Sequence, residues 1–275
     1  KGKLMHKKVI ICDLDGTLMN DERTIPEKNI QMIEDLWKEG YAFGLASGRP
    51  LDELMPKQQM WNLSRPFDVI IGMNGAELWD GFHQKEHSYF LMKKEWLKET
   101  LAIMQQWPCN PFIYLNHKIY AVKDDDLMRR SAEHSFKELV IVDSLEELYA
   151  QENAKILFRV NLEDMPKIEQ YVKEHPSPNY VGYKTQPTLF EFSDKRIAKA
   201  YAMHKFCEYN NLSNQDIVAF GDTTNDIELL KYCGTGVCMC NGSPDALAVA
   251  DVISDVDNNH AGVADYVYKK ILKKC

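Results

Sequence analysis

The sequence has no apolar run that approaches the roughly 20 residues a membrane-spanning helix needs. It also lacks an excess of positive charge, because 33 lysines and arginines face 41 aspartates and glutamates, for a formal net charge of −8. Nucleic-acid backbones and anionic lipid surfaces attract clustered positive charge, so we expect neither as a partner. The basic stretch Lys1 to Lys8 is followed by no apolar signal-peptide segment, which predicts a cytoplasmic location.

The seven cysteines show neither a disulfide framework nor metal-site spacing. Their number is odd, and even Cys238 and Cys240 lie only one residue apart within an apolar run. We therefore expect reduced thiols, some of them in the core. With 275 residues, 45% hydrophobic and 27% charged, the chain is long enough for one large or two moderate cores.

Strand and helix patterns alternate near both ends of the chain. Apolar runs predict strands at 9–12, 41–46 and 68–71, and a helix opens at Pro26 and stops at Gly40. After Ser193 the alternation resumes with helices at 197–210, 225–232 and 261–272, a helix start at Ser243-Pro244, and strands at 217–220, 235–238 and 252–253. This order predicts a doubly wound parallel α/β sheet.

The middle of the chain has a different pattern. It suggests helices at 93–107, 124–136 and 163–174, a hairpin of 112–115 with 118–122, and strands at 156–160, 180–184 and 189–192. This mixture predicts a separate α+β domain inserted at a loop of the first. We expect residues 1–82 and 193–275 to form the core domain and residues 83–192 the inserted domain.

The segment Asp13 to Leu18, DLDGTL, follows the first predicted strand directly. Sites in open α/β sheets form beyond the carboxyl ends of strands, and Gly16 permits a sharp turn there. Two carboxylates as close as Asp13 and Asp15 need a cation, or must divide into an ionised and a protonated partner. That suits a metal-dependent nucleophile beside a general acid, although the same residues could simply form a polar turn.

Three further segments supply complementary groups. They are Ser47-Gly48-Arg49 after the second strand, Lys199 in a later helix, and Gly221 to Asp226 after the strand at 217–220. Together with Asp13 and Asp15 they offer oxygen ligands for a hard cation and a hydroxyl and an ammonium for phosphoryl oxygens. Taken singly, each could be a solvated lysine, a turn or a helix cap.

With these motifs in this order, the sequence resembles the haloacid dehalogenase superfamily of phosphatases. Asn74-Gly75-Ala76 and the placing of the insertion resemble its Cof-type sugar-phosphate branch. The resemblance implies that Asp13 is the nucleophile, that Asp15 is the acid and then the base, and that Mg²⁺ is the cofactor. The implied Mg²⁺ site comprises the carboxylates of Asp13 and Asp222, the backbone carbonyl of Asp15, and Asp226 in support. The implied phosphate and substrate contacts are Ser47, Lys199 and Asn225, with Asn74, Gly48 and Arg49 near the substrate or the cap.

We therefore expect a Mg²⁺-dependent phosphomonoesterase of small metabolites. Sugar phosphates are the first candidates, followed by nucleotides and phosphorylated cofactors, and the protein would act as a monomer or homodimer. A phosphosugar mutase and a non-catalytic regulatory module remain alternatives. One departure from the branch is Cys240-Asn241-Gly242 in place of Gly-Asn-Ala, which affects a loop but removes no catalytic group.

Overall fold

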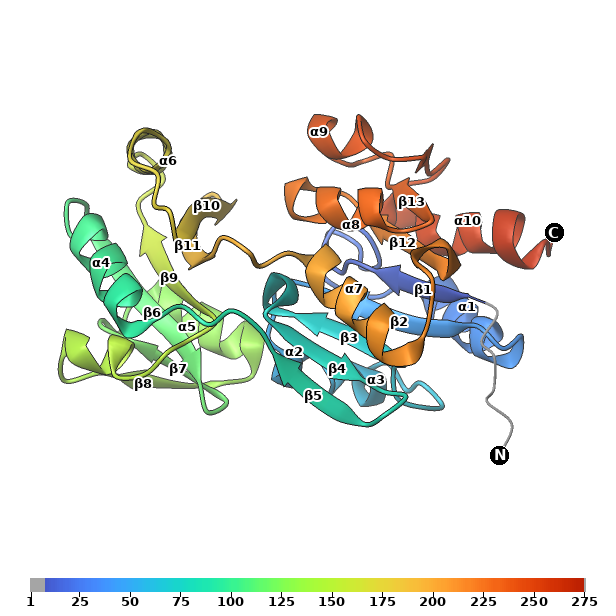
Figure 1. The fold of residues 1–275 in the computed structure, drawn as a ribbon, viewed down its shortest axis with the longest axis horizontal. Helices are drawn as coiled ribbons and strands as arrows, with labels where there is room; N and C mark the ends of the chain where they lie inside the picture. The colour runs from blue at the N-terminus through green and yellow to red at the C-terminus, as the bar shows by residue number, and fades with distance from the viewer. Residues whose placement is uncertain (1–7, 275) are drawn as a thin grey trace. The chain divides into compact units, whose positions relative to one another are not determined.

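The computed structural model describes residues 8–274 and divides into two compact units (Figure 1). The core unit contains the chain up to Ser88 and from Ala198 onward, and the insert unit spans Tyr89–Ile197. Both junctions fall later than the predicted 82/83 and 192/193, because strand β5 (Lys85–Ser88) pairs within the core sheet and strand β11 (Leu189–Asp194) extends past residue 192. The basic segment at 1–7, used above to predict location, lies outside the described residues.

The core unit contains an eight-stranded sheet in the order β14-β13-β12-β1-β2-β3-β4-β5. Six of these strands run parallel, with β1 between β12 and β2, which confirms the predicted doubly wound α/β class. The strands are β1 Val9–Cys12, β2 Ala42–Ala46, β3 Val69–Gly72, β4 Glu77–Asp80, β5 Lys85–Ser88, β12 Ile217–Gly221, β13 Thr235–Cys238 and β14 Val252–Ile253.

Strands β4 and β5 extend this sheet as an antiparallel hairpin, which the sequence pattern does not predict. The reason lies in β5, whose residues Lys85–Ser88 are polar and largely exposed. An edge strand of this kind lacks the apolar alternation by which strands are found.

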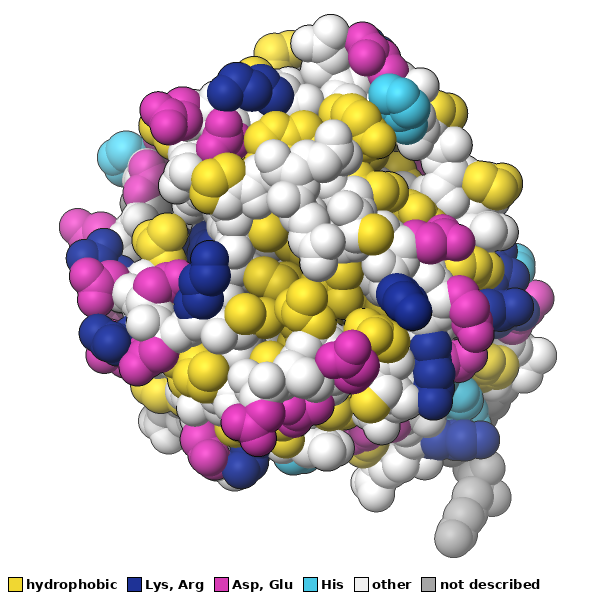
Figure 2. Space-filling view, turned by 90° about the vertical axis from the view of Figure 1, so that its left-hand side faces the viewer, with side chains coloured by type: hydrophobic (Ala, Val, Ile, Leu, Met, Phe, Trp, Pro, Cys, Tyr) yellow, Lys and Arg dark blue, Asp and Glu magenta, His cyan; other side chains and the backbone are white. Residues whose placement is uncertain are grey.

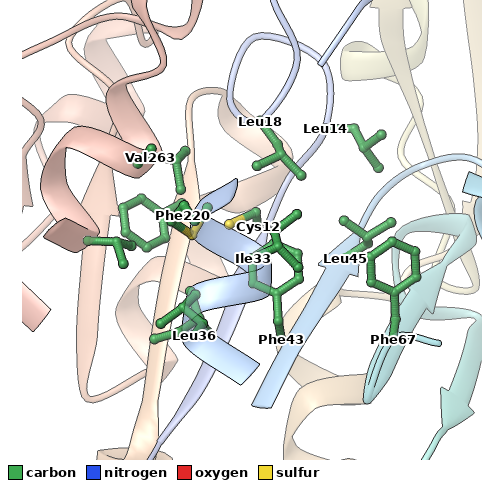
Figure 3. Close-up of a cluster of buried hydrophobic side chains, with 14 of the residues drawn as sticks. Cys12, Leu14, Leu18, Ile33, Leu36, Phe43, Leu45, Phe67, Phe220 and Val263 are labelled. Atoms are coloured by element: carbon green, nitrogen blue, oxygen red, sulfur yellow. The ribbon is translucent and has the colours of Figure 1, made fainter. Parts of the chain in front are cut away.

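The apolar core on one face of this sheet packs alternate strand residues against helices (Figure 3). Cys12 of β1, Phe43 of β2 and Phe220 of β12 meet Ile33 of α1 and Val263 of α10. Helices α7 and α8 contact the sheet through β3, β4, β12 and β13 and bury their apolar residues outside this cluster. The helices are α1 Glu27–Lys38, α2 Leu51–Leu54, α3 Lys57–Met60, α7 Lys199–Asn210, α8 Ile227–Tyr232, α9 Pro244–Leu247 and α10 Gly262–Tyr266, followed by a π-helical segment at Val267–Leu272.

The insert unit contains a six-stranded sheet in the order β10-β11-β9-β6-β7-β8. Its pairs are antiparallel except for β7 with β8, and the predicted hairpin turn closes between Leu115 and Lys118. Side chains alternate between two apolar clusters, so that Ile156 and Phe158 lie in one and Leu157 in the other. The elements are α4 Lys94–Met104, β6 Cys109–Leu115, β7 Lys118–Ala121, α5 Asp126–Ser135, β8 Glu138–Ile141, β9 Lys155–Val160, α6 Met165–Glu174, β10 Tyr180–Gln186 and β11 Leu189–Asp194.

Surface charge is mixed on the face drawn in Figure 2, where lysines and arginines are interspersed with aspartates and glutamates. Within residues 8–274 no helix combines the length and apolarity that crossing a bilayer requires. The described cysteines are free, and only Cys240 among them is exposed.

Candidate active site

Strand pairing brings the candidate residues to one edge of the core sheet. The backbone N–H of Asp13 donates to the carbonyl of Phe220 (2.9 Å), where β1 and β12 end side by side. Ser47 follows β2, the other neighbour of β1, and its N–H donates to Ile71 at the end of β3 (2.8 Å). Because parallel strands end at the same edge, segments far apart in sequence meet there.

A buried lysine joins two carboxylates at the centre of this edge. Lys199 Nζ lies 2.6 Å from Asp13 Oδ1 and 2.7 Å from Asp226 Oδ1. Lys199 is 1% exposed, Asp226 is fully buried and Asp13 is 6% exposed. Lys199 is the first residue of α7, so the start of that helix places its ammonium at the ends of β1 and β12.

The loop after β12 is fixed by the second oxygen of Asp226. Asp226 Oδ2 accepts hydrogen bonds from the backbone N–H groups of Asp222 (3.0 Å) and Thr223 (3.2 Å). Thr17 Oγ1 donates to Asp222 Oδ1 (2.8 Å), which connects the DLDGTL loop to this one. Gly16 has φ +83°, and a Cβ there would lie 2.4 Å from Asp222 Oδ2, so both its conformation and its contacts require glycine.

Three of these carboxylates form a candidate cation site. Asp13, Asp222 and Asp226 each offer an oxygen within 4.8 Å of the others. Carboxylate oxygens suit a hard divalent cation such as Mg²⁺, and the single ammonium of Lys199 leaves negative charge in excess among these four groups. The residues present therefore fit the ion.

The pKa values reflect the same crowding of negative charge. Burial, opposed by Lys199, leaves the pKa of Asp13 well above its ordinary value. Burial, and next the charge of Asp226, raises the pKa of Asp222 to about 6. Burial alone would lower the pKa of Lys199, but Asp13 and Asp226 hold it above its usual value. These carboxylates resist being ionised at the same time, and a bound divalent cation would stabilise their ionised forms.

Asp15 lies apart from this cluster and forms an ion pair with Arg49. Arg49 Nη2 lies 2.8 Å from Asp15 Oδ1 and 2.9 Å from Oδ2, and Nε donates to Oδ2 at 3.2 Å. The Asp15 side chain is 50% exposed and that of Arg49 is 23% exposed. The carboxylate of Asp15 therefore does not belong to the cluster of three carboxylates. Only the backbone carbonyl of Asp15 remains as its predicted ligand for the metal.

The other predicted contact residues lie in one hydrogen-bonded group. The N–H of Asn74 donates to the Ser47 carbonyl (3.0 Å), and Asn225 Nδ2 donates to Asn74 Oδ1 (3.2 Å). A Cβ on Gly48 would lie 3.2 Å from the same oxygen, so Asn74 closely approaches that loop. Residues 73–75 all have positive φ, which turns the chain sharply after β3.

Two residues outside the predicted set also hold the site together. Thr17 orients Asp222, as described above, and Asn241 Nδ2 donates to the Gly16 carbonyl (2.8 Å) while its Oδ1 accepts from the N–H of Asn258 (3.2 Å). Thr17 is part of the DLDGTL segment and could have been found there. Asn241 lies in the segment that departs from the family pattern, and its spacing gives no sign of this contact.

Comparison with known proteins gives consistent results over almost the whole chain. A family model described as haloacid dehalogenase-like hydrolase matches residues 10–267. The 5-amino-6-(5-phospho-D-ribitylamino)uracil phosphatase of Bacillus subtilis is 26% identical over 275 residues, covering 94% of this chain and 96% of the relative. The pyridoxal phosphate phosphatase of Escherichia coli is 26% identical over 281 residues, covering 98% of this chain and 100% of the relative.

Among solved structures, a haloacid dehalogenase-like hydrolase from Bacteroides thetaiotaomicron aligns with a TM-score of 0.84 at 22% identity. The alignment covers 95% of this chain and 98% of that one, which shows a shared fold.

Proposed function

Because the chain belongs to the haloacid dehalogenase-like hydrolases and is a phosphatase of that family, we propose that it hydrolyses phosphomonoesters through a phosphorylated Asp13. The observation that carries this proposal is the buried contact of Lys199 with Asp13 (2.6 Å) and Asp226 (2.7 Å), beside Asp222. A carboxylate nucleophile, an ammonium for phosphoryl oxygens and a cation site thus lie within one small volume.

In the first step the Asp13 carboxylate attacks phosphorus. A bond forms between its oxygen and phosphorus, the bond from phosphorus to the leaving oxygen breaks, and Asp15 gives its proton to that oxygen. Before this step Arg49 must release Asp15, whose two carboxylate oxygens accept hydrogen bonds from the guanidinium, and the freed carboxylate must take up a proton from solvent. The two aspartates lie in different surroundings, because Asp13 is buried and the side chain of Asp15 is half-exposed. This difference suits the different roles proposed for them.

In the second step water hydrolyses the aspartyl phosphate. Asp15, now ionised, takes a proton from water as the water oxygen bonds to phosphorus, and the bond from phosphorus to Asp13 breaks. Free phosphate leaves, and both aspartates return to their starting states.

Binding of the transferring group is proposed for Ser47, Lys199 and Asn225, with Asn74, Gly48 and Arg49 around the rest of the substrate. Asp13, Asp222 and Asp226, with the backbone carbonyl of Asp15, would hold Mg²⁺. The ion supplies positive charge that offsets the repulsion between an anionic nucleophile and an anionic phosphate.

The substrate class proposed is small phosphorylated metabolites, with sugar phosphates first and nucleotides or phosphorylated cofactors next. The mixed charge of the face in Figure 2 supports a small-molecule substrate rather than nucleic acid. Free cysteines among the described residues support a reducing, cytoplasmic location. Action as a monomer or homodimer is part of the same proposal.

The experiment is phosphate release from a panel of small phosphomonoesters, with Mg²⁺ and with EDTA. We expect release that requires the metal and favours a few substrates. Absence of release from every substrate, in protein shown by circular dichroism to be folded, would overturn the proposal.

A further inference from the structure

Three asparagines from other parts of the core unit donate to backbone carbonyls of the DLDGTL loop and the residue after it. The contacts are Asn241 Nδ2 with the Gly16 carbonyl (2.8 Å), Asn29 Nδ2 with that of Leu18 (2.8 Å) and Asn258 Nδ2 with that of Met19 (3.1 Å). The three donors lie after β13, in α1 and in the 3₁₀ turn Asn258–His260 before α10. Three separate segments thus bind one short stretch of backbone.

The hydrogen bonds within the loop use other carbonyls. They run from the N–H groups of Thr17, Leu18 and Met19 to the carbonyls of Asp13 and Leu14. The loop is also anchored by apolar side chains, since Leu14 and Leu18 point into the core cluster (Figure 3). Backbone carbonyls in such a segment need donors from elsewhere, and the asparagine amides supply them.

Asn258 connects the two ends of this stretch. Its Nδ2 also donates to Asp21 Oδ1 (3.0 Å), and its backbone N–H donates to Asn241 Oδ1 (3.2 Å). Asn258 is 1% exposed. One buried residue therefore binds Met19 and Asp21 and also orients the amide that binds Gly16.

Gly16 lies between two residues on which the proposed reaction depends. Asp15 precedes it, and Thr17 follows it and donates to Asp222 Oδ1 (2.8 Å). Because each peptide unit is planar, rotation of the Gly16 carbonyl would move both neighbours. A glycine with φ +83° has little steric restraint of its own, so the amide of Asn241 supplies the restraint.

We infer that Asn258 and Asn241 are positioning residues, which hold the DLDGTL loop in the geometry in which Asp13 and Asp15 react. The inference rests on the proposed function and adds to it two residues that act only through the loop backbone. Misplacement of reacting groups by about 1 Å costs roughly 100-fold in rate. Phosphate contacts outside the loop, such as Ser47, would remain. Loss of either amide should therefore lower kcat and leave KM nearly unchanged.

A role in stability alone would use the same contacts, and Asn110 of the insert unit provides the matched control. Asn110 is 3% exposed, and its Nδ2 donates to the Lys123 carbonyl (2.7 Å) and to the carboxylate of Asp125, two residues later (2.7 Å). Asn258 Nδ2 binds a carbonyl and a carboxylate with the same spacing. Substitution of either asparagine by alanine removes the same volume and the same kinds of hydrogen bond, and it introduces no charge.

The test combines kinetics with amide hydrogen exchange. Phosphate release from p-nitrophenyl phosphate and glucose 6-phosphate gives kcat and KM, and mass spectrometry in EDTA follows exchange in residues 13–21. Asn258→Ala should lower kcat by roughly 100-fold and accelerate exchange in 13–21 by roughly tenfold, as for loss of a hydrogen bond. Asn110→Ala should lower the melting temperature by a similar amount but leave kcat and this exchange unchanged.

Asn241→Ala decides the question if Asn258→Ala does not fold, because Asn241 is exposed and donates to the loop directly. The inference would be overturned if kcat of the folded variants fell no further than that of Asn110→Ala, or if it fell without faster exchange in 13–21. Either outcome leaves the proposed function intact while the wild type releases phosphate. A wild type that releases phosphate from no substrate would overturn both.

Discussion

Two buried lysines, one in each unit, hold carboxylates in different ways. In the insert unit Lys155 Nζ lies 2.9 Å from Glu191 Oε2, and the two residues are 5% and 2% exposed. In the core unit Lys199 contacts both Asp13 and Asp226, and Asp222 offers a third oxygen to the same cluster. Lys155 and Glu191 lie on adjacent strands, β9 and β11, whereas the core cluster comes from two loops and a helix start.

We expect this difference to separate a structural use of buried charges from a reactive one. An ion pair between neighbouring strands is matched in charge and stabilises the sheet only while both partners remain. A cluster in which carboxylates outnumber the ammonium is less favourable for stability, but it attracts a cation and keeps a nucleophile available. The following experiments test this contrast.

The largest expected effect is on activity, at Asp13. Asp13→Asn keeps the shape of the side chain but removes the nucleophile, so phosphate release should fall by more than roughly 10⁴-fold. The far-ultraviolet circular dichroism spectrum should remain that of the wild type. Turnover near the wild-type rate would show that Asp13 is not the nucleophile.

In the insert unit, substitution within the Lys155–Glu191 pair should reduce the stability of the protein. Lys155→Met leaves the Glu191 carboxylate buried without its ammonium, and we expect the free energy of unfolding in urea to fall by about 3–5 kcal/mol. The double variant Lys155→Met, Glu191→Leu removes both charges and should recover most of this loss. A single variant as stable as the wild type would refute a structural role for the pair.

The excess of carboxylates in the core predicts a pH dependence for protein kept in EDTA. In the folded protein Asp222 has a pKa of about 6, against an ordinary value of 3.8. Folding therefore takes up a proton between these values, and the free energy of unfolding should fall by roughly 2–3 kcal/mol as the pH rises through that window. Asp222→Asn should make the profile between pH 4 and pH 6 less steep, and the remaining slope belongs to other shifted groups such as Asp13.

A smaller effect is expected from the hydroxyl that orients Asp222. Thr17 is fully buried and donates to Asp222 Oδ1 at 2.8 Å, so Thr17→Val removes the hydrogen bond with little change in volume. Loss of a partner that orients a metal ligand should weaken Mg²⁺ binding by roughly tenfold. Titration of phosphate release with Mg²⁺ measures this, and an unchanged half-saturation concentration would contradict it.

The smallest effects on stability are expected at two glycines with the same backbone conformation. Gly16 and Gly40 both have φ +83°, but a Cβ on Gly16 would meet Asp222, whereas one on Gly40 would have no neighbour within 4 Å. Both alanine variants should lose about 1 kcal/mol of stability from backbone strain. Only Gly16→Ala should also lose phosphatase activity, and equal activity in the two variants would exclude the contact with Asp222 as its cause.

Much of the fold was predictable because its strands are short apolar runs. The parallel strands of the core and the hairpin after Leu115 follow from such patterns. Strands β5 and β8 were not predicted, because both are edge strands whose side chains are half-buried or exposed. Edge strands bury too little surface to impose a clear alternation on their sequence.

The sequence predicts which residues form the candidate site better than it predicts the contacts between them. Motifs at strand ends identify Asp13 and Asp222, but the pairing of β1 with β12 that makes them neighbours depends on residues far apart in sequence. The contact of Asp15 with Arg49 depends on side-chain packing, for which the sequence offers no signal. The catalytic roles of all these residues remain predictions.

The position of β1 beside β12 also has a consequence for synthesis of the chain. Thr17 and Asp222, whose side chains meet in the finished site, are 205 residues apart, and the whole insert unit lies between them. At about 5–20 residues per second, a ribosome needs roughly 10–40 s to cover that interval. During this time β1 is exposed on the nascent polypeptide without one of its two neighbours, while the six-stranded sheet emerges with all its pairing partners. Completion of the candidate active site is thus a late event in translation.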